Sequence, residues 1–430
     1  MRYLYTMLFY LLLPAVMLRL LWRAIRFPDY ARRWNERFGF FDYKKPNPAL
    51  SQTIWIHAVS LGETLAATPL VKALQKQHPD ANFIITTMTP TGSQQVRTVF
   101  KDSAFHVYAP YDIPGPIQRF LDRIQPNLLI IIETELWPNL LHYTAARQIP
   151  IILANARLSE KSACGYQRVR WLTREMLNQI SVLMVQTSIE ADRFMQLGMP
   201  KNRIKIAGNI KFDITVPEQH IADAQQLRQQ WGSHRPVWIA ASTHPNEEKI
   251  VLAAFKKIQL HEPETLLILV PRHPDRRQEM LHLCAEYHTV LRSAQKPVTS
   301  HMEIFLIDTI GELMLFYAAS DVAFVGGSFI PLGGHNLLEP AVLSMPILTG
   351  PHMHNFSDIT QRLSDAGAAS IVTNTEELAD KTLYFLQHPS QRHLTGEKGR
   401  QVVFNNRGAL HAHIDAITEV FLSTLKSRFS

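Results

Sequence analysis

The chain alternates between two spacings of apolar residues. Short runs of β-branched and other apolar residues end in turns, and longer segments between them repeat apolar residues every three to four positions. Short continuous runs predict buried strands, and the periodic segments predict helices. Strands that alternate with helices in this way are typical of a parallel sheet covered by helices. The pattern therefore predicts an α/β protein.

The predicted strands fall into two sets. The first set comprises residues 53–59, 82–87, 128–133, 149–154, 182–186 and 204–207. The second set comprises residues 237–241, 265–271, 304–307, 322–325 and 346–348. A polar, glutamine-rich stretch, 217–230, lies between the sets and predicts a boundary near residues 213–225. We expect two Rossmann-like domains, residues 27–215 and 216–430.

Two helical segments have clear apolar faces. Residues 63–77 repeat apolar residues at helical spacing directly after the first strand. The last segment, 410–421, has Ile417 and Phe421 at the same spacing, which predicts a packing role. We assign this last helix to the second domain and leave open its return onto the first.

The first 26 residues predict a membrane anchor. Residues 3–18 carry no charge, and the apolar run continues to Trp22 when the Arg19 head bends toward water. About 20 helical residues match the roughly 30 Å of a hydrocarbon core, but Pro14 predicts a kink, so spanning and embedding both stay open. The arginines after the run place the rest of the chain in the cytoplasm. The alternatives are a secretory signal, for which no small-residue cleavage site is present, and a buried domain helix.

Length and composition exclude several classes of protein. With 430 residues, of which 46% are apolar and 19% charged, the chain is globular and is neither disordered nor a small disulfide scaffold. Its net charge is +7, but residues 1–45 hold nine basic residues against three acidic ones and supply most of it. The remaining body is near neutral, which argues against a nucleic-acid partner. We expect the basic segment to contact anionic membrane lipids.

Cysteine and histidine positions give no predicted metal site. Cys164 and Cys284 are far apart and form no CxxC or zinc spacing, so we expect neither a structural disulfide nor structural zinc. His352 and His354 lie close together and, with His335, imitate a set of metal ligands. We nevertheless expect no metal and no cofactor.

A first candidate for chemistry follows the first predicted strand. The turn Ser60-Leu61-Gly62-Glu63 ends that strand, and Gly62 is predicted to permit a tight turn before a helix. Glu63 is then either a general base for an acceptor hydroxyl or an ordinary first-turn acid favoured by the helix dipole. The residues alone leave both roles open.

Two further turns of the first domain carry charged residues. Glu133 and Glu135 end a strongly apolar run, and strand alternation predicts that both point to the same side, near Glu63. Burying two acids without partners costs free energy, so a functional role is favoured over a structural one. Lys211 follows the last strand of the first set and is either a cation for a leaving phosphate or an exposed lysine.

The second domain supplies features of a phosphate site. Arg272 follows a strand, and residues 308–313 turn from a strand into a helix. The glycine-rich segment 325–340 opens another helix, and such turns cradle phosphate oxygens. Arg272 suits a phosphate, and Glu339 suits ribose hydroxyls. An ordinary glycine loop is the alternative.

Three absent motifs narrow the chemistry further. The sequence contains no GxxxxGK[ST] and no GxGxxG, which argues against a P-loop nucleotidase and weakens a dinucleotide oxidoreductase. No two aspartates stand two apart, so the usual metal clamp for a nucleotide diphosphate is missing. The sequence therefore predicts a nucleotide site in the second domain that faces an acid–base site in the first.

Six ordered motifs resemble one known family. HAVSLGE, ETELWPN, GNIKFD, PRHP, DTIGEL and GGSFIPLGGHNLLEP occur in that order between residues 57 and 340. Together they resemble the transferases of 3-deoxy-D-manno-octulosonic acid (Kdo) in lipopolysaccharide synthesis. The resemblance implies the GT-B fold, in which two Rossmann-like domains border a deep cleft, and an N-terminal membrane anchor.

The resemblance also implies a reaction and its residues. It implies inverting, metal-independent transfer of Kdo from CMP-Kdo to the lipid A precursor lipid IVA at the cytoplasmic side of the inner membrane, with release of CMP and no cofactor. Glu63 matches the family's proton acceptor, and Glu133 and Lys211 match its transition-state residues. The CMP-binding positions are Pro271, Arg272, Gly311, Glu312, Leu313, Asn336, Leu337, Leu338 and Glu339.

Two alternatives to this function remain. Another GT-B enzyme, such as a nucleotide-sugar epimerase or a different lipid glycosyltransferase, shares the glycine turn and Glu339 but is not expected to combine SLGE with ETELWP. A membrane-attached protein that only binds nucleotide or lipid needs no base, so loss of Glu63 leaves such a protein active.

Overall fold

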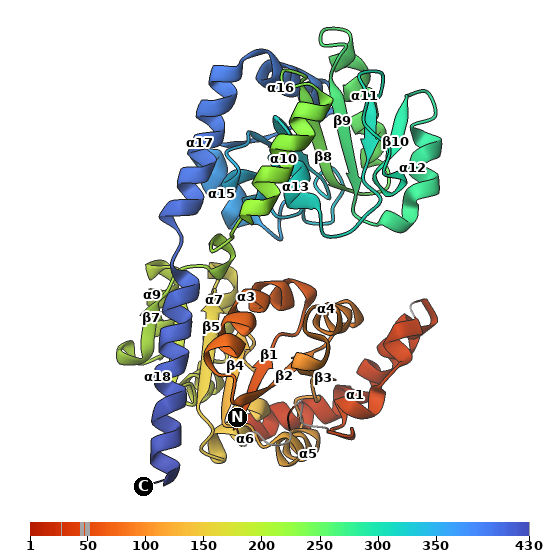
Figure 1. The fold of residues 1–430 in the computed structure, drawn as a ribbon. Helices are drawn as coiled ribbons and strands as arrows, with labels where there is room; N and C mark the ends of the chain where they lie inside the picture. The colour runs from red at the N-terminus through yellow and green to blue at the C-terminus, as the bar shows by residue number, and fades with distance from the viewer. Residues whose placement is uncertain (27, 44–46, 48–51, 430) are drawn as a thin grey trace. The chain divides into compact units, whose positions relative to one another are not determined.

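The computed structural model describes residues 1–26, 28–43, 47 and 52–429. Contacts divide the chain into two units, which Figure 1 draws as ribbons. The N-terminal unit comprises Met1–Ile210 with Arg407–Ser430, and the C-terminal unit comprises Lys211–Asn406. The division after Ile210 lies slightly before the boundary placed at residue 215 from the sequence.

The N-terminal unit contains a seven-stranded parallel sheet in the order β3-β2-β1-β4-β5-β6-β7. Its strands are β1 (Gln52–His57), β2 (Ala81–Thr87), β3 (Phe105–Tyr108), β4 (Leu128–Ile132), β5 (Ile151–Ala156), β6 (Val182–Val185) and β7 (Ile204–Ile206). Its helices include α3 (Leu61–Gln77), α4 (Pro90–Phe100), α5 (Pro114–Ile124), α6 (Pro138–Ala146), α7 (Glu160–Arg168), α8 (Arg170–Asn178) and α9 (Ser188–Gln196).

Strand β4 explains why this sheet is covered on both faces. Its residues are all apolar and fully buried, and successive side chains point to opposite faces of the sheet. Leu129 and Ile131 join one core cluster with α5, α6 and α9, whereas Ile130 joins another with α3 and α4. A continuous apolar run therefore supplies two cores.

The C-terminal unit repeats this plan with a second seven-stranded parallel sheet, ordered β10-β11-β9-β8-β12-β13-β14. Its strands are β8 (Val237–Thr243), β9 (Leu266–Pro271), β10 (Thr289–Leu291), β11 (Ile304–Leu306), β12 (Val322–Val325), β13 (Ile347–Thr349) and β14 (Ala369–Ile371). Its helices are α10 (Glu218–Trp231), α11 (Glu247–Gln259), α12 (Arg277–Leu283), α13 (Leu313–Ala318), α14 (Leu338–Val342), α15 (Ser357–Asp365), α16 (Thr375–Gln387) and α17 (Pro389–Asn405). The predicted α/β class with two parallel sheets is confirmed.

The last helix returns to the N-terminal unit. Helix α18 (Ala409–Phe429) packs against α3 and β5, and it lies beside them in Figure 1. Ile417 and Phe421 are fully buried in the core cluster of α3 and β4, so the packing role predicted from their spacing is confirmed. The polar stretch 217–230, which suggested a boundary, forms helix α10 and buries Ala224.

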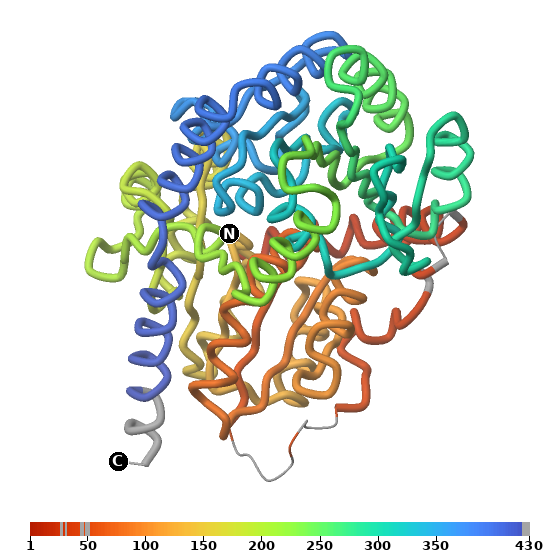
Figure 2. Tube along the Cα trace, turned by 45° about the horizontal axis from the view of Figure 1, so that its top comes forward, coloured from red at the N-terminus to blue at the C-terminus, as the bar shows by residue number. Residues whose placement is uncertain are grey.

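Helix α1 (Arg2–Arg26) contains the predicted anchor, with Pro14 inside it. By length and composition it passes as a membrane span. Figures 1 and 2 show it leaving the N-terminus beside α6 and running along the unit before the chain turns back at η1 (Pro28–Ala31). The basic residues after it are not all exposed, because Arg37 is buried and Arg33 is partly buried.

Candidate active site

In both sheets successive strands are added first on one side of the first strand and then on its other side. Open α/β sheets bind ligands at this switch point, outside the carboxyl ends of the strands. In the N-terminal unit β1 lies between β2 and β4, so this point lies between the carboxyl ends of β1 and β4. The segments that follow these two strands carry Glu63, Glu133 and Glu135. The order of strands therefore brings the predicted acids together at one edge of the sheet.

Glu63 stands in the first turn of α3, held by its own N-cap. Ser60 caps the helix, its hydroxyl accepting from the Glu63 N–H at 3.2 Å. The Glu63 carboxylate in turn accepts from the Val59 N–H and from the Ser60 hydroxyl, each at 2.8 Å. The helix begins at Leu61, and a Cβ at Gly62 would meet only Ser60 Oγ at 3.8 Å, so the tight turn predicted at Gly62 is wrong.

Burial gives the Glu63 carboxyl an unusual proton affinity. Its side chain is 7% exposed, and burial raises its pKa to about 7, with the charges of Glu135 and Glu133 adding to the rise. The hydrogen bonds from Ser60 and Val59 oppose the rise without cancelling it. A carboxylate with a pKa near the working pH is suited to accept a proton. The helix cap fixes its position, so Glu63 is a first-turn acid of α3, and its role as a general base stays a prediction.

Glu133 does not follow strand alternation. Strand β4 ends at Ile132, and Glu133 adopts a left-handed backbone with φ of 59°. Its carboxylate forms an ion pair with Arg157 at 3.1 Å. The prediction that pleating points Glu133 and Glu135 to the same side is therefore wrong, because neither residue belongs to the strand.

Glu135 lies beside Glu63 and Glu133, but the sequence analysis did not include it among the candidate catalytic residues. Its carboxylate accepts from the Trp137 indole N–H at 2.7 Å, and the Trp137 ring packs edge-on to the buried His57 ring at 4.6 Å. Burial raises the pKa of Glu135, and its charge outweighs that of Glu133 in raising the pKa of Glu63. The ETE pattern was the available signal, but the pattern does not rank its two acids.

The third predicted catalytic residue belongs to the other unit. Lys211 lies in the short 3-10 helix η4 (Ile210–Phe212), and it is the first residue of the C-terminal unit. Its Nζ lies 6.0 Å from the centre of the Phe356 ring. Glu63 and Glu133 belong to the N-terminal unit, so the predicted catalytic set is divided between the two units.

In the C-terminal unit the corresponding point lies between the carboxyl ends of β8 and β12, and Glu247 contacts the segments that follow both strands. Glu247 is fully buried at the start of α11. Its carboxylate accepts from the N–H groups of Gly327, Ser328 and Phe329 at 2.6 to 2.9 Å, and from that of His244 at 3.0 Å. These N–H groups therefore already have an acceptor. Sequence reasoning missed Glu247 because it stands far from the glycine-rich segment along the chain.

Two histidines meet beside this loop. His244 and His335 lie with their Nε2 atoms 2.9 Å apart and their rings parallel within 2°. A Cβ at Gly327 would lie 2.9 Å from the His335 ring, so glycine is required for this approach. Burial and the nearby Arg272 lower the pKa of His335 to about 4, and burial lowers the pKa of His244. Both shifts favour neutral rings, which can share one N–H···N hydrogen bond.

The predicted nucleotide residues follow the ends of strands β9, β11 and β12. Pro271 ends β9, and the exposed Arg272 follows it. Gly311 has a φ of 94°, and Leu313 begins α13. The carboxylate of Glu312 is already paired with Arg292 at 2.6 Å.

The NLLE segment divides into buried and accessible groups. Leu337 and Leu338 are fully buried in the core, so only their backbone is available to a ligand. The Asn336 amide donates to the Glu339 carboxylate at 3.2 Å. Burial raises the pKa of Glu339, while Asn336 and Arg272 oppose the rise. A half-buried carboxylate with a fixed orientation suits hydroxyl groups.

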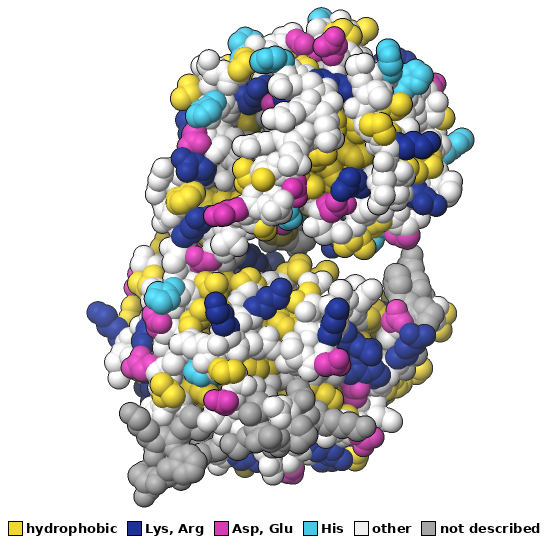
Figure 3. All heavy atoms as spheres, viewed as in Figure 1, with side chains coloured by type: hydrophobic (Ala, Val, Ile, Leu, Met, Phe, Trp, Pro, Cys, Tyr) yellow, Lys and Arg dark blue, Asp and Glu magenta, His cyan; other side chains and the backbone are white. Residues whose placement is uncertain are grey.

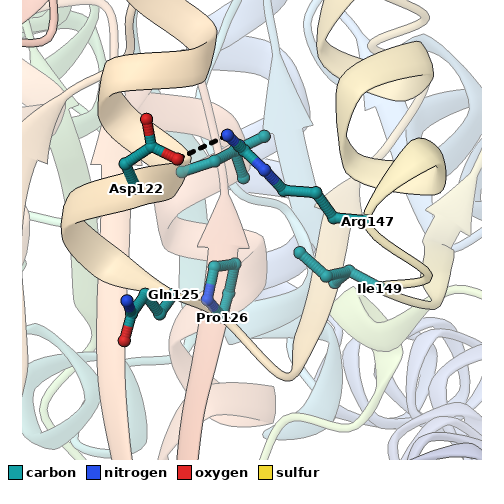
Figure 4. Close-up of a pocket in the computed structure, with 6 residues that line it drawn as sticks. Asp122, Gln125, Pro126, Arg147 and Ile149 are labelled. Carbon is teal, nitrogen blue, oxygen red and sulfur yellow. Dashed lines mark hydrogen bonds and ion pairs between the residues drawn. The ribbon is translucent and has the colours of Figure 1, made fainter.

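Two other features concern metal binding and a surface pocket. Among the described residues no three His, Cys, Asp or Glu side chains come together as a metal would need, and His335 pairs with His244. A surface pocket is lined by Leu121, Asp122, Gln125, Pro126, Arg147 and Ile149. Figure 4 shows Arg147 reaching across it to Asp122, at the amino ends of β4 and β5 and so away from the acids.

Solved structures share this architecture. The UDP-GlcNAc 2-epimerase from Neisseria meningitidis, bound to UDP-GlcNAc, aligns over 87% of this chain and 100% of its own, with a TM-score of 0.54 and 14% identity. A glycosyltransferase from Rickettsia africae aligns over 89% and 100%, with a TM-score of 0.52 and 15% identity. At such identity the likeness concerns the fold alone. The two parallel-sheet units define the chain as a GT-B-fold protein, as predicted.

Sequence comparison gives the family. Residues 32–214 match the family described as 3-deoxy-D-manno-octulosonic-acid transferase (kdotransferase). The transferase of that name from Haemophilus influenzae is 39% identical over 97% of this chain and 98% of its own. The one from Bordetella pertussis is 34% identical over 89% and 90%. The chain belongs to the Kdo transferase family and is a glycosyltransferase of lipopolysaccharide synthesis, which confirms the resemblance seen in its motifs.

Proposed function

We propose that this chain transfers Kdo from CMP-Kdo to the lipid A precursor lipid IVA, with inversion at the anomeric carbon, without a metal ion and with release of CMP. The observation that carries the proposal is the Glu63 carboxylate, held at the sheet edge with a pKa of about 7. A base that is half ionised near neutral pH suits the activation of a sugar hydroxyl. Membership of the Kdo transferase family supports Kdo as the transferred sugar.

The proposed reaction is a single displacement. Glu63 takes the proton of the acceptor hydroxyl while the hydroxyl oxygen forms a bond to the anomeric carbon of Kdo. The bond between that carbon and the phosphate oxygen of CMP breaks, and its electron pair leaves with CMP. Because attack and departure occur on opposite faces of the ring, the configuration inverts. Glu133 stabilises the positive charge that develops at the anomeric carbon.

The donor is assigned to the C-terminal unit. Arg272, exposed beyond β9, and Lys211 neutralise the phosphate of departing CMP. Glu339, oriented by Asn336, accepts hydrogen bonds from the ribose hydroxyls. Pro271, Gly311, Glu312, Leu313, Leu337 and Leu338 complete the proposed CMP site, the two buried leucines through their backbone.

The chemistry of the donor supports metal independence. CMP carries one phosphate, so the charge that leaves is smaller than that of a nucleoside diphosphate, which enzymes commonly neutralise with a metal clamp. Kdo brings a carboxylate of its own. Two protein cations, Arg272 and Lys211, suit a leaving group of this charge.

We place the protein at the inner membrane with both units on the cytoplasmic side. Helix α1 is long and apolar enough for a bilayer and leaves most of its apolar side chains exposed. Exposed arginines, among them Arg32, suit the anionic lipids of that face. An acceptor that carries acyl chains resides in the same membrane.

Transfer by the purified full chain in detergent, with CMP-Kdo, lipid IVA and EDTA, tests the proposal. We expect products heavier than lipid IVA by whole Kdo units, together with CMP. Product that forms only after magnesium is added would contradict metal independence. Consumption of CMP-Kdo without transfer, or no reaction under either condition, would contradict the assigned donor and acceptor.

A further inference from the structure

Helix α1 has one partly covered face and an open apolar face. Its less exposed residues recur every three to four positions along the whole helix, from Arg2 through Thr6, Phe9 and Leu13 to Leu20. The exposed large apolar residues are Tyr3, Leu4, Met7, Leu8, Tyr10, Leu11, Leu12, Leu18, Leu21, Trp22 and Ile25. A helix that only hung from the protein by its C-terminal end would show no such stripe.

The first turns of α1 are fastened to the N-terminal unit by a buried polar hub around Asn139. Arg2 and Thr6 donate to the Asn139 side-chain oxygen, each at 3.1 Å. The Asp112 carboxylate accepts from the backbone N–H groups of Asn139 and Leu140 at 3.1 and 2.7 Å. Arg2, Thr6, Asp112 and Asn139 are all buried, so breaking this hub leaves polar groups without partners.

The chain beyond the other end of α1 is fastened to the same unit. Arg33 donates to the His106 carbonyl at 2.9 Å, and Arg37 donates to the Met88 carbonyl at 2.9 Å. His106 belongs to β3, and Met88 follows β2. Helix α1 therefore lies between two attachments to one folded unit.

The stretch between α1 and its second attachment is too short to recross a bilayer. Seven residue steps separate Arg26 from Arg33, and fully extended they reach about 25 Å. A hydrocarbon core is about 30 Å thick. If α1 crossed the bilayer, its first turns and Arg33 would lie on opposite sides of the membrane. Both are bound to the same N-terminal unit, so this arrangement would pull one of them away from it. We propose that α1 does not cross the membrane and that one leaflet, on the side of the N-terminal unit, covers its apolar face.

The side chains around the open face favour lipid as the occupant. Arg19 and Arg23 are exposed within the apolar helix, and Arg32 is exposed beyond it. Figure 3 shows Lys and Arg side chains gathered over α4 and the second half of α1. Exposed aromatic residues such as Trp22 accompany them. Apolar area bordered by cations and aromatic rings is the pattern of helices that lie in a membrane interface.

The hub also joins the lipid-facing helix to the acid loop. Asn139 belongs to ETELWPN, the motif that carries Glu133 and Glu135, and it stands in the first turn of α6. A helix seated in one leaflet and fastened at Asn139 fixes the height of these acids above the lipid surface. This inference rests on the proposed function, in which the acceptor sugar belongs to a membrane lipid.

Cysteine labelling of the full chain tests whether α1 crosses. One variant carries a short hydrophilic extension with a single cysteine before Met1, and a second carries Arg32→Cys; both have the exposed Cys164 replaced by serine. An impermeant maleimide is applied to inverted inner-membrane vesicles and to intact spheroplasts, and detergent-solubilised protein checks that both thiols react. We expect both sites to react in the vesicles and neither in spheroplasts.

The outcomes separate this inference from the proposed function. Reaction of one site in vesicles and of the other in spheroplasts would overturn the non-crossing arrangement. Reaction of both sites only in spheroplasts would overturn the cytoplasmic side. Neither readout depends on Kdo transfer, so a failed transfer assay leaves the labelling result intact.

A second variant tests the link through Asn139. Thr6→Val removes one hydroxyl of the hub at nearly constant volume, and Thr382→Val removes a buried hydroxyl from α16 in the other unit. We expect Thr6→Val to lower the rate of transfer to lipid IVA in vesicles about fivefold relative to the rate in detergent. This factor corresponds to the free energy of about one buried hydrogen bond. Thr382→Val should leave the ratio of the two rates unchanged. An unchanged ratio in Thr6→Val would overturn the link.

Discussion

At the scale of single residues, Glu63 balances two opposing effects. Two hydrogen bonds, from Val59 and Ser60, stabilise its charged form, and burial destabilises it. Burial prevails and brings the pKa to about 7. The same contacts fix the carboxylate in the first turn of α3, so its orientation and its proton affinity have one structural origin.

Replacing Glu63 by glutamine separates the chemistry from binding. Because the amide cannot take the acceptor's proton, we expect Glu63→Gln to lower the turnover number about 10²- to 10⁴-fold while CMP affinity stays within about twofold. The matched control is Glu190→Gln, which alters another first-turn cap of the same unit, in α9. Transfer kinetics and CMP calorimetry provide the measurements. Equal losses of turnover and CMP affinity in Glu63→Gln would assign the residue to binding instead.

The rate of transfer should depend on pH through Glu63. In the proposed reaction the ionised carboxylate is the base, so we expect the rate to rise about tenfold per pH unit below 7 and to level above it. Removing the nearby negative charge of Glu135 lowers the pKa of Glu63. The rising part of the pH–rate profile should therefore move to lower pH in Glu135→Gln. It should stay in place in the control Glu160→Gln, which changes an exposed acid. A profile that does not move in Glu135→Gln would argue against this coupling.

At the scale of elements, the sequence located the inner strands better than the outer ones. Each predicted strand lies within two residues of an observed one, whereas β3, β10 and β14 were missed. All three are edge strands, and β10 and β14 have three residues each. An edge strand pairs on one side only, so it needs less apolar surface and leaves a weaker pattern.

The glycine turn before α14 is set by close packing. Gly334 has a φ of 74°, a left-handed backbone that favours glycine, and a Cβ there would displace the buried Met353 side chain. We expect Gly334→Ala to lower the free energy of unfolding by at least about 2 kcal/mol and to weaken CMP binding, because the turn carries the NLLE segment. Gly165→Ala, which meets nothing within 4 Å inside α7, should instead stabilise the protein by up to about 1 kcal/mol.

Denaturant titration and CMP calorimetry measure both glycine variants. Unchanged CMP affinity in a destabilised Gly334→Ala protein would show that the turn does not shape the nucleotide site.

Glu247 holds the loop after β12 through hydrogen bonds to a charged group. Glu247→Gln places an amide donor against N–H groups and removes the buried charge that they stabilise. We expect a loss of about 3 kcal/mol in the free energy of unfolding. The control Glu376→Gln breaks an exposed ion pair with Lys257 and should cost under about 1 kcal/mol. Equal effects in thermal melts would contradict the role given to Glu247.

At the scale of the whole molecule, the N-terminal unit is assembled from both ends of the chain. Phe421 of α18 is fully buried among residues of α3 and β4, which precede it by hundreds of positions. We expect Phe421→Ala to destabilise the N-terminal unit by about 3–5 kcal/mol and to leave CMP binding in the other unit intact. Phe404→Ala, at a side chain 46% exposed, should cost far less.

Calorimetric unfolding with and without CMP follows both phenylalanine variants. If Phe421→Ala lowers the midpoint of the transition that CMP stabilises as much as that of the other transition, the assignment of Phe421 to the core of the N-terminal unit alone would be contradicted.

The sequence by itself determined the α/β class, the two parallel sheets, the family and the segments that carry its charged residues. These follow from local spacing, because a buried strand needs an apolar run and a helix face needs a three-to-four-residue period. Only the tertiary structure decided that Glu133 pairs with Arg157, that Glu247 occupies the N–H groups of a distant loop, and that Arg2 reaches Asn139. Which distant residues pair depends on packing and on the need of buried polar groups for hydrogen-bond partners. The spacing of residues along the sequence does not indicate either.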